Sequence, residues 1–235
     1  SMVMSEKEKT MTAYHEAGHA IVGYLMPEHD PIHKVTIIPR GRALGITWFL
    51  PEADRISTSK RKLRSDIATA YGGRIAEEMI YGADGVSTGA YSDIQMATSI
   101  ARAMVVNYGL SEKLGALDYD ARDGEGFREK NISAGTAELI DNEIKNILDA
   151  CYAQAAEILA ANADILETMK AALMEYETLD SEQVADLMER RAVRAPPALP
   201  RRRAAGLAGC RPEHAAGLHR ARPRPGGGRA RLRQP

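Results

Sequence analysis

The sequence predicts a mainly α fold: a helical domain with a small β-hairpin or sheet near its first helix and a further helical region toward the C-terminus. Along most of the 235-residue chain, apolar side chains recur at three- and four-residue spacing, which is typical of helices with one buried face. One stretch, residues 34–50, is instead rich in β-branched residues. The 44% of hydrophobic residues suffices for the core of one large or two small domains.

The first elements follow from this spacing. Residues 6–26 form a predicted helix that Pro27 ends. Two strands are expected at residues 34–39 and 44–50, joined by a turn that contains Gly41.

The rest of the folded part is predicted to be helical, apart from a Gly- and Asp-rich loop. Asn162 and Asp180 are expected to cap two final helices, the last of which ends near Met188. The longer helices are expected at residues 59–82, 90–108 and 133–160, and the loop at residues 111–131.

Composition excludes several classes of protein. Two cysteines, Cys151 and Cys210, provide neither a disulfide framework nor a four-cysteine zinc site. No apolar run approaches the ~20 residues of a membrane-spanning helix, so we expect this piece to be soluble. We interpret residues 1–9, which are polar and unlike a signal peptide, as a cloning remainder (Ser1 and Met2) and the lead-in to the first helix.

The formal net charge of −1 averages two unlike parts. Residues 190–235 contain 13 arginines, no lysine and one acid, Glu213, whereas the preceding residues hold the other 18 basic and 31 acidic residues. The same C-terminal segment holds seven of the 11 prolines and has little to bury. We therefore predict an acidic folded domain at residues 10–191 and a disordered tail at residues 192–235.

The pattern His15-Glu-Ala-Gly-His19 carries the chemistry. On a helix, side chains four residues apart share a face, so both imidazoles can bind one zinc ion. Glu16 lies about 100° around the helix, beside the metal, where its carboxylate can accept a proton from water. The alternative is two surface histidines on an amphipathic helix. Gly18 costs such a helix ~1 kcal/mol relative to Ala, which is reasonable if another backbone approaches closely there.

A catalytic zinc ion needs a third protein ligand. Leu25 stands where a third histidine of an extended motif would be, which excludes that arrangement. His29 and His33 follow Pro27 closely and are more simply interpreted as polar loop residues. Acids further along the chain remain as candidates, namely Glu77, Glu78, Asp84 and Asp93.

Four motifs occur in order: His15-Glu-Ala-Gly-His19, Ile38-Pro-Arg-Gly41, Gly72-Gly-Arg-Ile-Ala-Glu-Glu78 and Ser87-Thr-Gly-Ala-Tyr-Ser-Asp-Ile94. Together they closely resemble the peptidase domain of the FtsH family of membrane-anchored, ATP-dependent zinc metalloproteases. The resemblance covers residues 10–191 and implies a helical zinc-metallopeptidase domain.

The resemblance also implies roles for individual residues. His15 and His19 are expected to bind zinc, Glu16 to act as the catalytic base and Asp93 to be the third ligand. The position of Asp93 near the start of a predicted helix favours its ionised form. Either acid of the pair Glu77–Glu78 can orient a ligand histidine, or the pair is a solvated part of a helix face.

For the longer protein, the resemblance implies one zinc ion per chain, unfolded or damaged polypeptides as substrates and a homo-hexamer. ATP is needed only by an ATPase module that this chain lacks, since no phosphate-binding loop motif occurs in it. The parent protein is expected at the cytoplasmic face of a bacterial inner membrane, or at an organelle membrane, through an N-terminal part that this chain also lacks.

Two features depart from the family. Tyr91 stands where family members usually carry a small residue, and it can narrow the site. After Arg194 the sequence loses the family's pattern, which is consistent with a frameshifted or vector-derived ending.

The predicted strands suggest how substrate binds. An extended polypeptide can add to an open edge of the strand pair through its backbone, unless the pair merely covers the helices. Two other functions compete with this one. The arginine-rich tail could bind nucleic acid, although it lacks aromatic residues for stacking. The domain could also be an inactive scaffold that keeps zinc only for folding. Because all three motif residues are present, we expect an active zinc endopeptidase that binds no nucleic acid.

Overall fold

The computed structural model describes residues 4–41, 43–51, 53–54, 56–119 and 132–195. It confirms a mainly α fold with a small antiparallel sheet. The helices and strands, in chain order, are α1 (Glu6–Leu25), β1 (Ile32–Thr36), β2 (Ile46–Phe49), α2 (Lys60–Tyr81), the 3-10 turns η1 (Ala83–Gly85) and η2 (Thr88–Ala90), α3 (Tyr91–Val106), α4 (Ala134–Ala161), α5 (Ala163–Tyr176), β3 (Thr178–Asp180) and α6 (Ser181–Met188).

Helix α1 begins and ends where local chemistry requires it. Ser5 accepts a hydrogen bond from the Glu8 backbone N–H, and the Glu8 carboxylate accepts one from the Ser5 backbone in return. This capping box satisfies amide groups that have no partner within the first turn. The helix ends at Leu25, one residue before the predicted end, and Pro27 follows.

Helices α1 and α2 pack with their backbones in close approach at two glycines. A Cβ atom on Gly18 would lie 2.2 Å from the carbonyl oxygen of Gly72, and one on Gly72 would lie 2.5 Å from the carbonyl oxygen of Gly18. No side chain fits in that space. The expectation that Gly18 serves a close backbone contact is therefore confirmed.

The sheet has the strand order β2-β1-β3, with both pairs antiparallel. Both predicted strands are present with other bounds: β1 begins two residues before the predicted start and ends at Thr36 instead of residue 39, and β2 is shorter at both ends. Strand β1 carries an irregularity between Ile32 and Lys34. The third strand, β3, was not predicted. Strand β2 lies at one edge, and no other strand in the described ranges pairs with its outer side.

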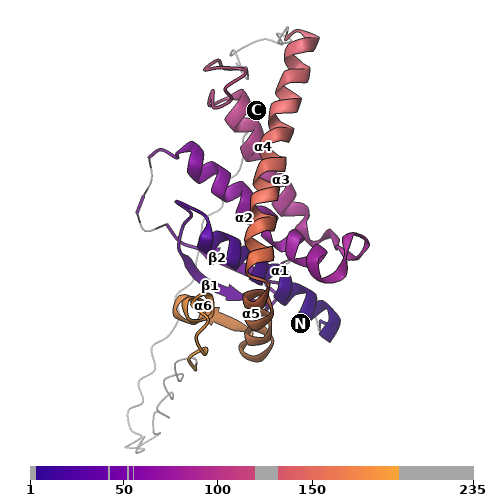
Figure 1. The fold of residues 1–235 in the computed structure, drawn as a ribbon, viewed down its shortest axis with the longest axis vertical. Coiled ribbons are helices and arrows are strands. Elements are labelled where there is room, and N and C mark those ends of the chain that lie inside the picture. Colours follow the sequence, from indigo (N-terminus) through magenta and orange to yellow (C-terminus); the bar gives the residue numbers. More distant parts are fainter. Residues whose placement is uncertain (1–3, 42, 52, 55, 120–131, 196–235) are drawn as a thin grey trace, which may run out of the picture. The chain divides into compact units, whose positions relative to one another are not determined.

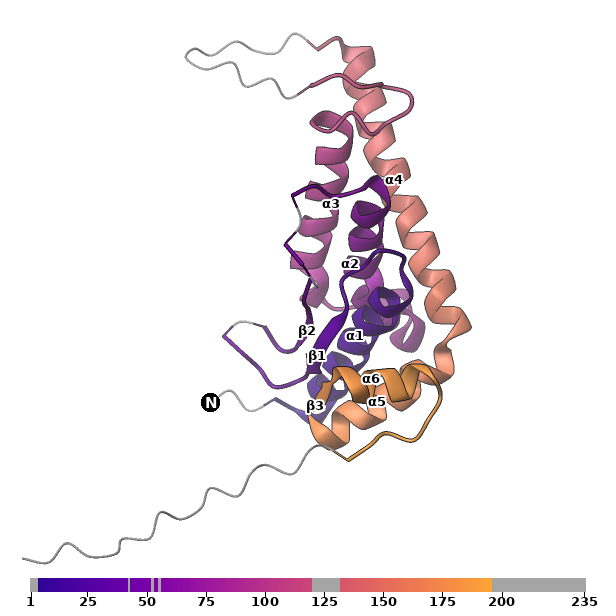
Figure 2. The same ribbon diagram turned by 90° about the vertical axis from the view of Figure 1, so that its left-hand side faces the viewer.

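The remaining helices complete the core around α1 and α2. The long helix α4 runs alongside α2 and α3, and α5 and α6 lie at its C-terminal end, next to β3 (Figures 1 and 2). Asp180 caps α6 as predicted, with a reciprocal bond to Gln183. Asn162 marks the start of α5, but its side chain donates to the carbonyl of Ile158 and so closes α4 instead of capping α5. Large side chains that are fully buried include Ile21, Ile67, Met104, Leu159, Leu166 and Leu173.

Two predicted regions lie largely outside the described residues. Of the predicted loop, residues 111–119 are described and contain no helix or strand, and residues 120–131 are not described. Of the predicted tail only residues 192–195 are described, and there Arg194 pairs with Asp186. No helix in the described ranges combines the length and apolar character needed to cross a membrane.

Candidate metal centre and catalytic cavity

His15 and His19 lie one turn apart on α1 with their rings side by side. Their Nε2 atoms are 3.0 Å from each other, and the ring centroids are 4.7 Å apart. Each Nδ1 atom has its own partner at 2.8 Å: the Glu77 carboxylate for His15 and the Thr69 carbonyl oxygen for His19. A ring that donates from Nδ1 keeps the lone pair of Nε2 for a metal.

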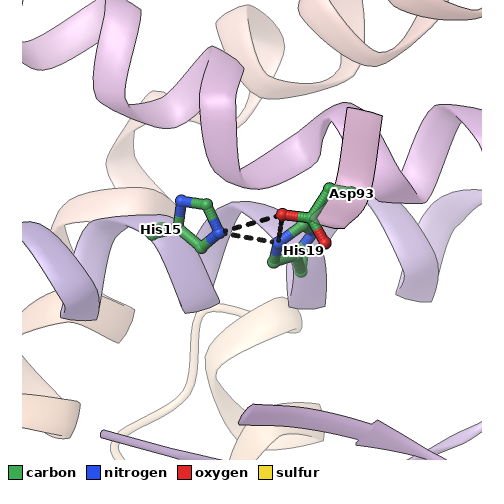
Figure 3. A group of neighbouring side chains, drawn as sticks. All are labelled: His15, His19 and Asp93. Atoms are coloured by element: carbon green, nitrogen blue, oxygen red, sulfur yellow. Dashed lines mark hydrogen bonds and ion pairs between the residues drawn. The ribbon is translucent and has the colours of Figure 1, made fainter. Parts of the chain in front are cut away.

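Asp93 comes to these rings from the first turn of α3 (Figure 3). Its Oδ2 atom lies 3.4 Å from Nε2 of His15 and 3.5 Å from Nε2 of His19. Among the described residues, these three side chains form the only group of three or more metal-ligating residues whose donor atoms lie within 4.8 Å of one another. His15 and Asp93 are 78 residues apart in the sequence, so the cluster joins side chains from two different helices.

The donor set fits a zinc ion. At zinc–ligand distances of about 2.0–2.2 Å, two donors of a tetrahedral site stand about 3.3–3.6 Å apart. The two separations from Asp93, 3.4 and 3.5 Å, lie in that range, and the two Nε2 atoms, 3.0 Å apart, are slightly closer. Two imidazoles and one carboxylate also match a catalytic site, in which three protein ligands leave one position open.

Glu77, on α2, holds the His15 ring through its Nδ1 atom. It is 1% exposed, and its carboxylate accepts hydrogen bonds from the Ser87 backbone N–H at 2.7 Å and from the Ser87 hydroxyl at 3.1 Å. Glu77 thereby links His15 to the segment that leads into α3. Glu78 points elsewhere and accepts a hydrogen bond from Tyr152 at 2.5 Å.

The electrostatics of the cluster favour positive charge. Burial opposes protonation of His15, yet hydrogen bonds to Asp93 and Glu77 raise the pKa of His15 to about 9. Burial also acts to raise the pKa of Asp93, but hydrogen bonds from His15 and His19 hold it well below its usual value. The pKa of Glu77 is likewise lowered, against the effect of burial, chiefly by its hydrogen bond with His15. The site therefore attracts a cation, whether a proton or a metal ion.

Glu16 is buried beside the two histidines, with 6% of its surface exposed. The Thr47 hydroxyl, from strand β2, donates a hydrogen bond to Oε2 of Glu16 at 2.6 Å. Sequence reasoning missed Thr47, because a threonine within a β-branched run gives no signal of a contact with a helix.

The cluster opens into a cavity of about 1000 Å³. Its walls come from α1, β2, α2 and α3. The walls include Leu44, just before β2, Thr47 and Phe49 of β2, and Met96 and Ile100 of α3. Strand β2, whose outer edge is open, thus borders the cavity.

The other residues weighed from the sequence lie outside the cluster. His29 lines the cavity but contacts Asp66, at 3.4 Å, and the Phe49 ring. His33 packs against Trp48, and Asp84 is an exposed residue of η1. Tyr91 is 67% exposed at the cavity rim and accepts a hydrogen bond from Gln95.

Comparison with known proteins shows which sequences this chain resembles. The sequence signature described as Peptidase family M41 matches residues 2–187, which include every residue of the metal cluster. The chain is 57% identical to the ATP-dependent zinc metalloprotease FtsH of Buchnera aphidicola from Acyrthosiphon pisum, over 83% of the chain and 33% of that protein.

Proteins of the same name from other bacteria are also similar to this chain. The identity is 55% for Haemophilus influenzae, over 83% of the chain and 32% of that protein. It is 48% for Myxococcus xanthus, over 80% of the chain and 30% of that protein. The chain thus spans about a third of the length of these relatives.

Proposed function

Because the chain belongs to peptidase family M41 and is a zinc metalloendopeptidase domain of the FtsH type, we propose that His15, His19 and Asp93 hold its zinc ion and that Glu16 is its catalytic base. The observation that carries these assignments is the convergence of three donor atoms at the spacing of a tetrahedral zinc site, next to a buried carboxylate and a cavity.

In this proposal, different residues of the chain move the proton and orient the metal ligands. A bound zinc ion would polarise the scissile carbonyl and acidify water. Glu16 accepts the proton of the attacking water and passes it to the leaving amine. Glu77 and the Thr69 carbonyl fix the orientation of the two imidazoles, so that both Nε2 atoms face the ion.

We infer that substrate binds as an extended strand along the open edge of β2. Residues of β2 line the same cavity as the metal cluster, and no other strand in the described ranges pairs with the outer side of β2. Pairing through backbone groups tolerates many side chains. The substrates proposed are therefore unfolded or damaged polypeptides, which can present extended backbone.

The longer protein is proposed to be an ATP-dependent protease of which this chain is the peptidase part. The relatives named above are called ATP-dependent, and this chain covers about a third of them. In that protein, ATP would serve a module outside this chain. A homo-hexameric assembly and a place at the cytoplasmic face of a bacterial inner membrane, or at an organelle membrane, belong to the same proposal.

The test is hydrolysis of unfolded casein by the zinc-loaded chain and by its Glu16→Gln variant. Glu16→Gln should lower the rate by about 10²- to 10⁴-fold while zinc binding is retained, because only the proton acceptor is lost. Glu78→Gln, a change of the same kind outside the site, should leave the rate unchanged. Equal hydrolysis by the unmodified chain and Glu16→Gln would contradict the proposal.

A further inference from the structure

We propose that Gly45, just before the edge strand β2, and Thr47, within it, position Glu16 for proton transfer. This inference rests on the proposed function, in which Glu16 is the base. Thr47 and Gly45 contact Glu16. Both would act on the reaction through Glu16, so they are positioning residues.

The first observation is the hydrogen bond from Thr47. Its hydroxyl lies 2.6 Å from Oε2 of Glu16, a distance typical of a strong bond to an ionised carboxylate. Among the described residues, no other hydrogen bond reaches the Glu16 carboxylate. The direction of this carboxylate therefore depends on one hydroxyl from a different element.

The second observation is the absence of a side chain at position 45. A Cβ atom on Gly45 would lie 2.7 Å from both Cγ and Oε1 of Glu16. It would also lie 2.8 Å from Cγ2 of Thr12, so the Glu16 side chain fills the space that a larger residue would need. Gly45 thus lets the strand lie directly against the carboxylate that Thr47 holds.

These two contacts restrict the conformational freedom of the Glu16 side chain. A glutamate has three rotatable side-chain bonds, so without fixed contacts its carboxylate can point in several directions. Fixing it beforehand removes that conformational freedom before the reaction begins. Because Thr47 belongs to the strand on which substrate is proposed to add, and Gly45 directly precedes that strand, the same segment positions both the substrate backbone and the base.

A purely structural role for Thr47 makes a different prediction. Its hydroxyl also lies 3.1 Å from the backbone carbonyl oxygen of Glu16, a contact that would tie β2 to α1 whatever the glutamate side chain does. Losing only that contact would lower stability and leave kcat unchanged. Positioning of the base instead predicts a change in kcat at unchanged zinc binding.

The experiment compares Thr47→Val, Thr47→Ser and Gly45→Ala in the zinc-loaded full chain. Thr47→Val should lower kcat for an unfolded peptide at least about tenfold with KM changed less than about twofold, because only the transition state uses the aligned base. Thr47→Ser keeps the hydroxyl and should restore most of kcat. Gly45→Ala, which pushes the carboxylate aside while Thr47 stays, should lower kcat as Thr47→Val does.

The matched control is Thr36→Val. The Thr36 hydroxyl, in the neighbouring strand β1, bonds to Thr178 and to the Glu177 carbonyl and has no contact with Glu16. This variant should lose stability and keep kcat. A similar loss of kcat in Thr36→Val and Thr47→Val would overturn the inference, because a general disturbance of the sheet would then explain both.

A second measurement does not depend on turnover. A peptide hydroxamate binds a metal ion and hydrogen-bonds to a carboxylate beside it, so its affinity by calorimetry should fall in Thr47→Val and Gly45→Ala and recover in Thr47→Ser. Unchanged affinity and unchanged kcat in both variants would overturn the inference while the proposed function stands. Absence of hydrolysis and of hydroxamate binding in the unmodified chain would overturn the proposed function itself.

Discussion

Two partly buried histidine–carboxylate clusters contribute to the lining of the same cavity, and they differ in whether they contain a cation. The metal cluster consists of His15, His19 and Asp93. The lysine cluster consists of His29, Asp30, Lys62 and Asp66, where Lys62 is 5% exposed, lies 3.1 Å from Asp30 and also pairs with Asp66. In the described part of the chain, Asp93 makes no ion pair with lysine or arginine.

The two histidines show the consequence in opposite pKa shifts. Hydrogen bonds to carboxylates raise the pKa of His15 to about 9 in spite of burial. For His29, burial and the nearby Lys62 charge lower the pKa, although Asp66 and Asp30 act in the opposite direction. Among the described residues, Lys62 supplies positive charge to the carboxylates of the lysine cluster, whereas Asp93 has only the two imidazoles as charge partners.

The largest expected effect is on the metal cluster itself. Structural zinc sites bind with about 10–16 kcal/mol over four ligands, so loss of one ligand costs roughly 3–4 kcal/mol, or 100- to 1,000-fold in affinity. Asp93→Asn should weaken zinc binding by that factor in calorimetric titrations. Asp84→Asn, an exposed control on η1, should bind zinc as the unmodified chain does. Equal affinities in the two variants would remove Asp93 from the site.

The lysine cluster should respond in stability instead of metal binding. Lys62→Met leaves two half-buried carboxylates without their cation and should lower the free energy of unfolding by about 3 kcal/mol. The control is Lys145→Met, because Lys145 and Asp149 form an ion pair with the same four-residue spacing on an exposed face. That change should stay within about 0.5 kcal/mol in denaturant unfolding. Similar losses for both would show that burial does not separate the two pairs.

A smaller effect is expected where the metal cluster is supported from outside. Glu77→Gln removes the carboxylate that holds Nδ1 of His15 and should weaken zinc binding about 10- to 100-fold. Glu78→Gln, one residue along and bonded to Tyr152, should leave zinc affinity unchanged. The comparison fails if the neighbouring variant loses as much affinity as Glu77→Gln.

The smallest effect concerns pH and the lysine cluster. His29 has a lowered pKa in the folded chain, so the unfolded chain binds more protons below its ordinary pKa of 6.5. The His29 contribution to stability should therefore fall as the pH drops below about 6.5 and stay constant above it. His29→Gln should reduce this dependence in unfolding curves measured between pH 5 and pH 8, and an unchanged pH slope would refute the assignment.

The sequence predicts those parts of the site that a single helix places together. His15, Glu16 and His19 follow from the four-residue period of a helix, and Pro27 marks its end. The contact at Gly18 was also predictable, because a glycine within a helix needs a reason. Family membership, expected from four ordered motifs, is confirmed by the match to peptidase family M41.

The parts contributed by other elements could not be derived from spacing. Four acids were candidates for the third ligand, and no rule of local geometry separates Asp93 from Glu77; only the resemblance indicated Asp93. The contact of Thr47 depends on how the sheet lies on α1, and β3, with three residues, is too short to show a period. The roles of His15, Glu16, His19 and Asp93 in binding and catalysis stay predictions until they are measured.

Anomalous diffraction at the zinc edge, from crystals of the zinc-loaded chain, tests the central claim most directly. The account predicts one strong peak per chain, within bonding distance of Nε2 of His15, Nε2 of His19 and a carboxylate oxygen of Asp93, and no peak at the lysine cluster. A peak that lies away from Asp93, or a stronger one beside His29 and Asp66, would contradict it.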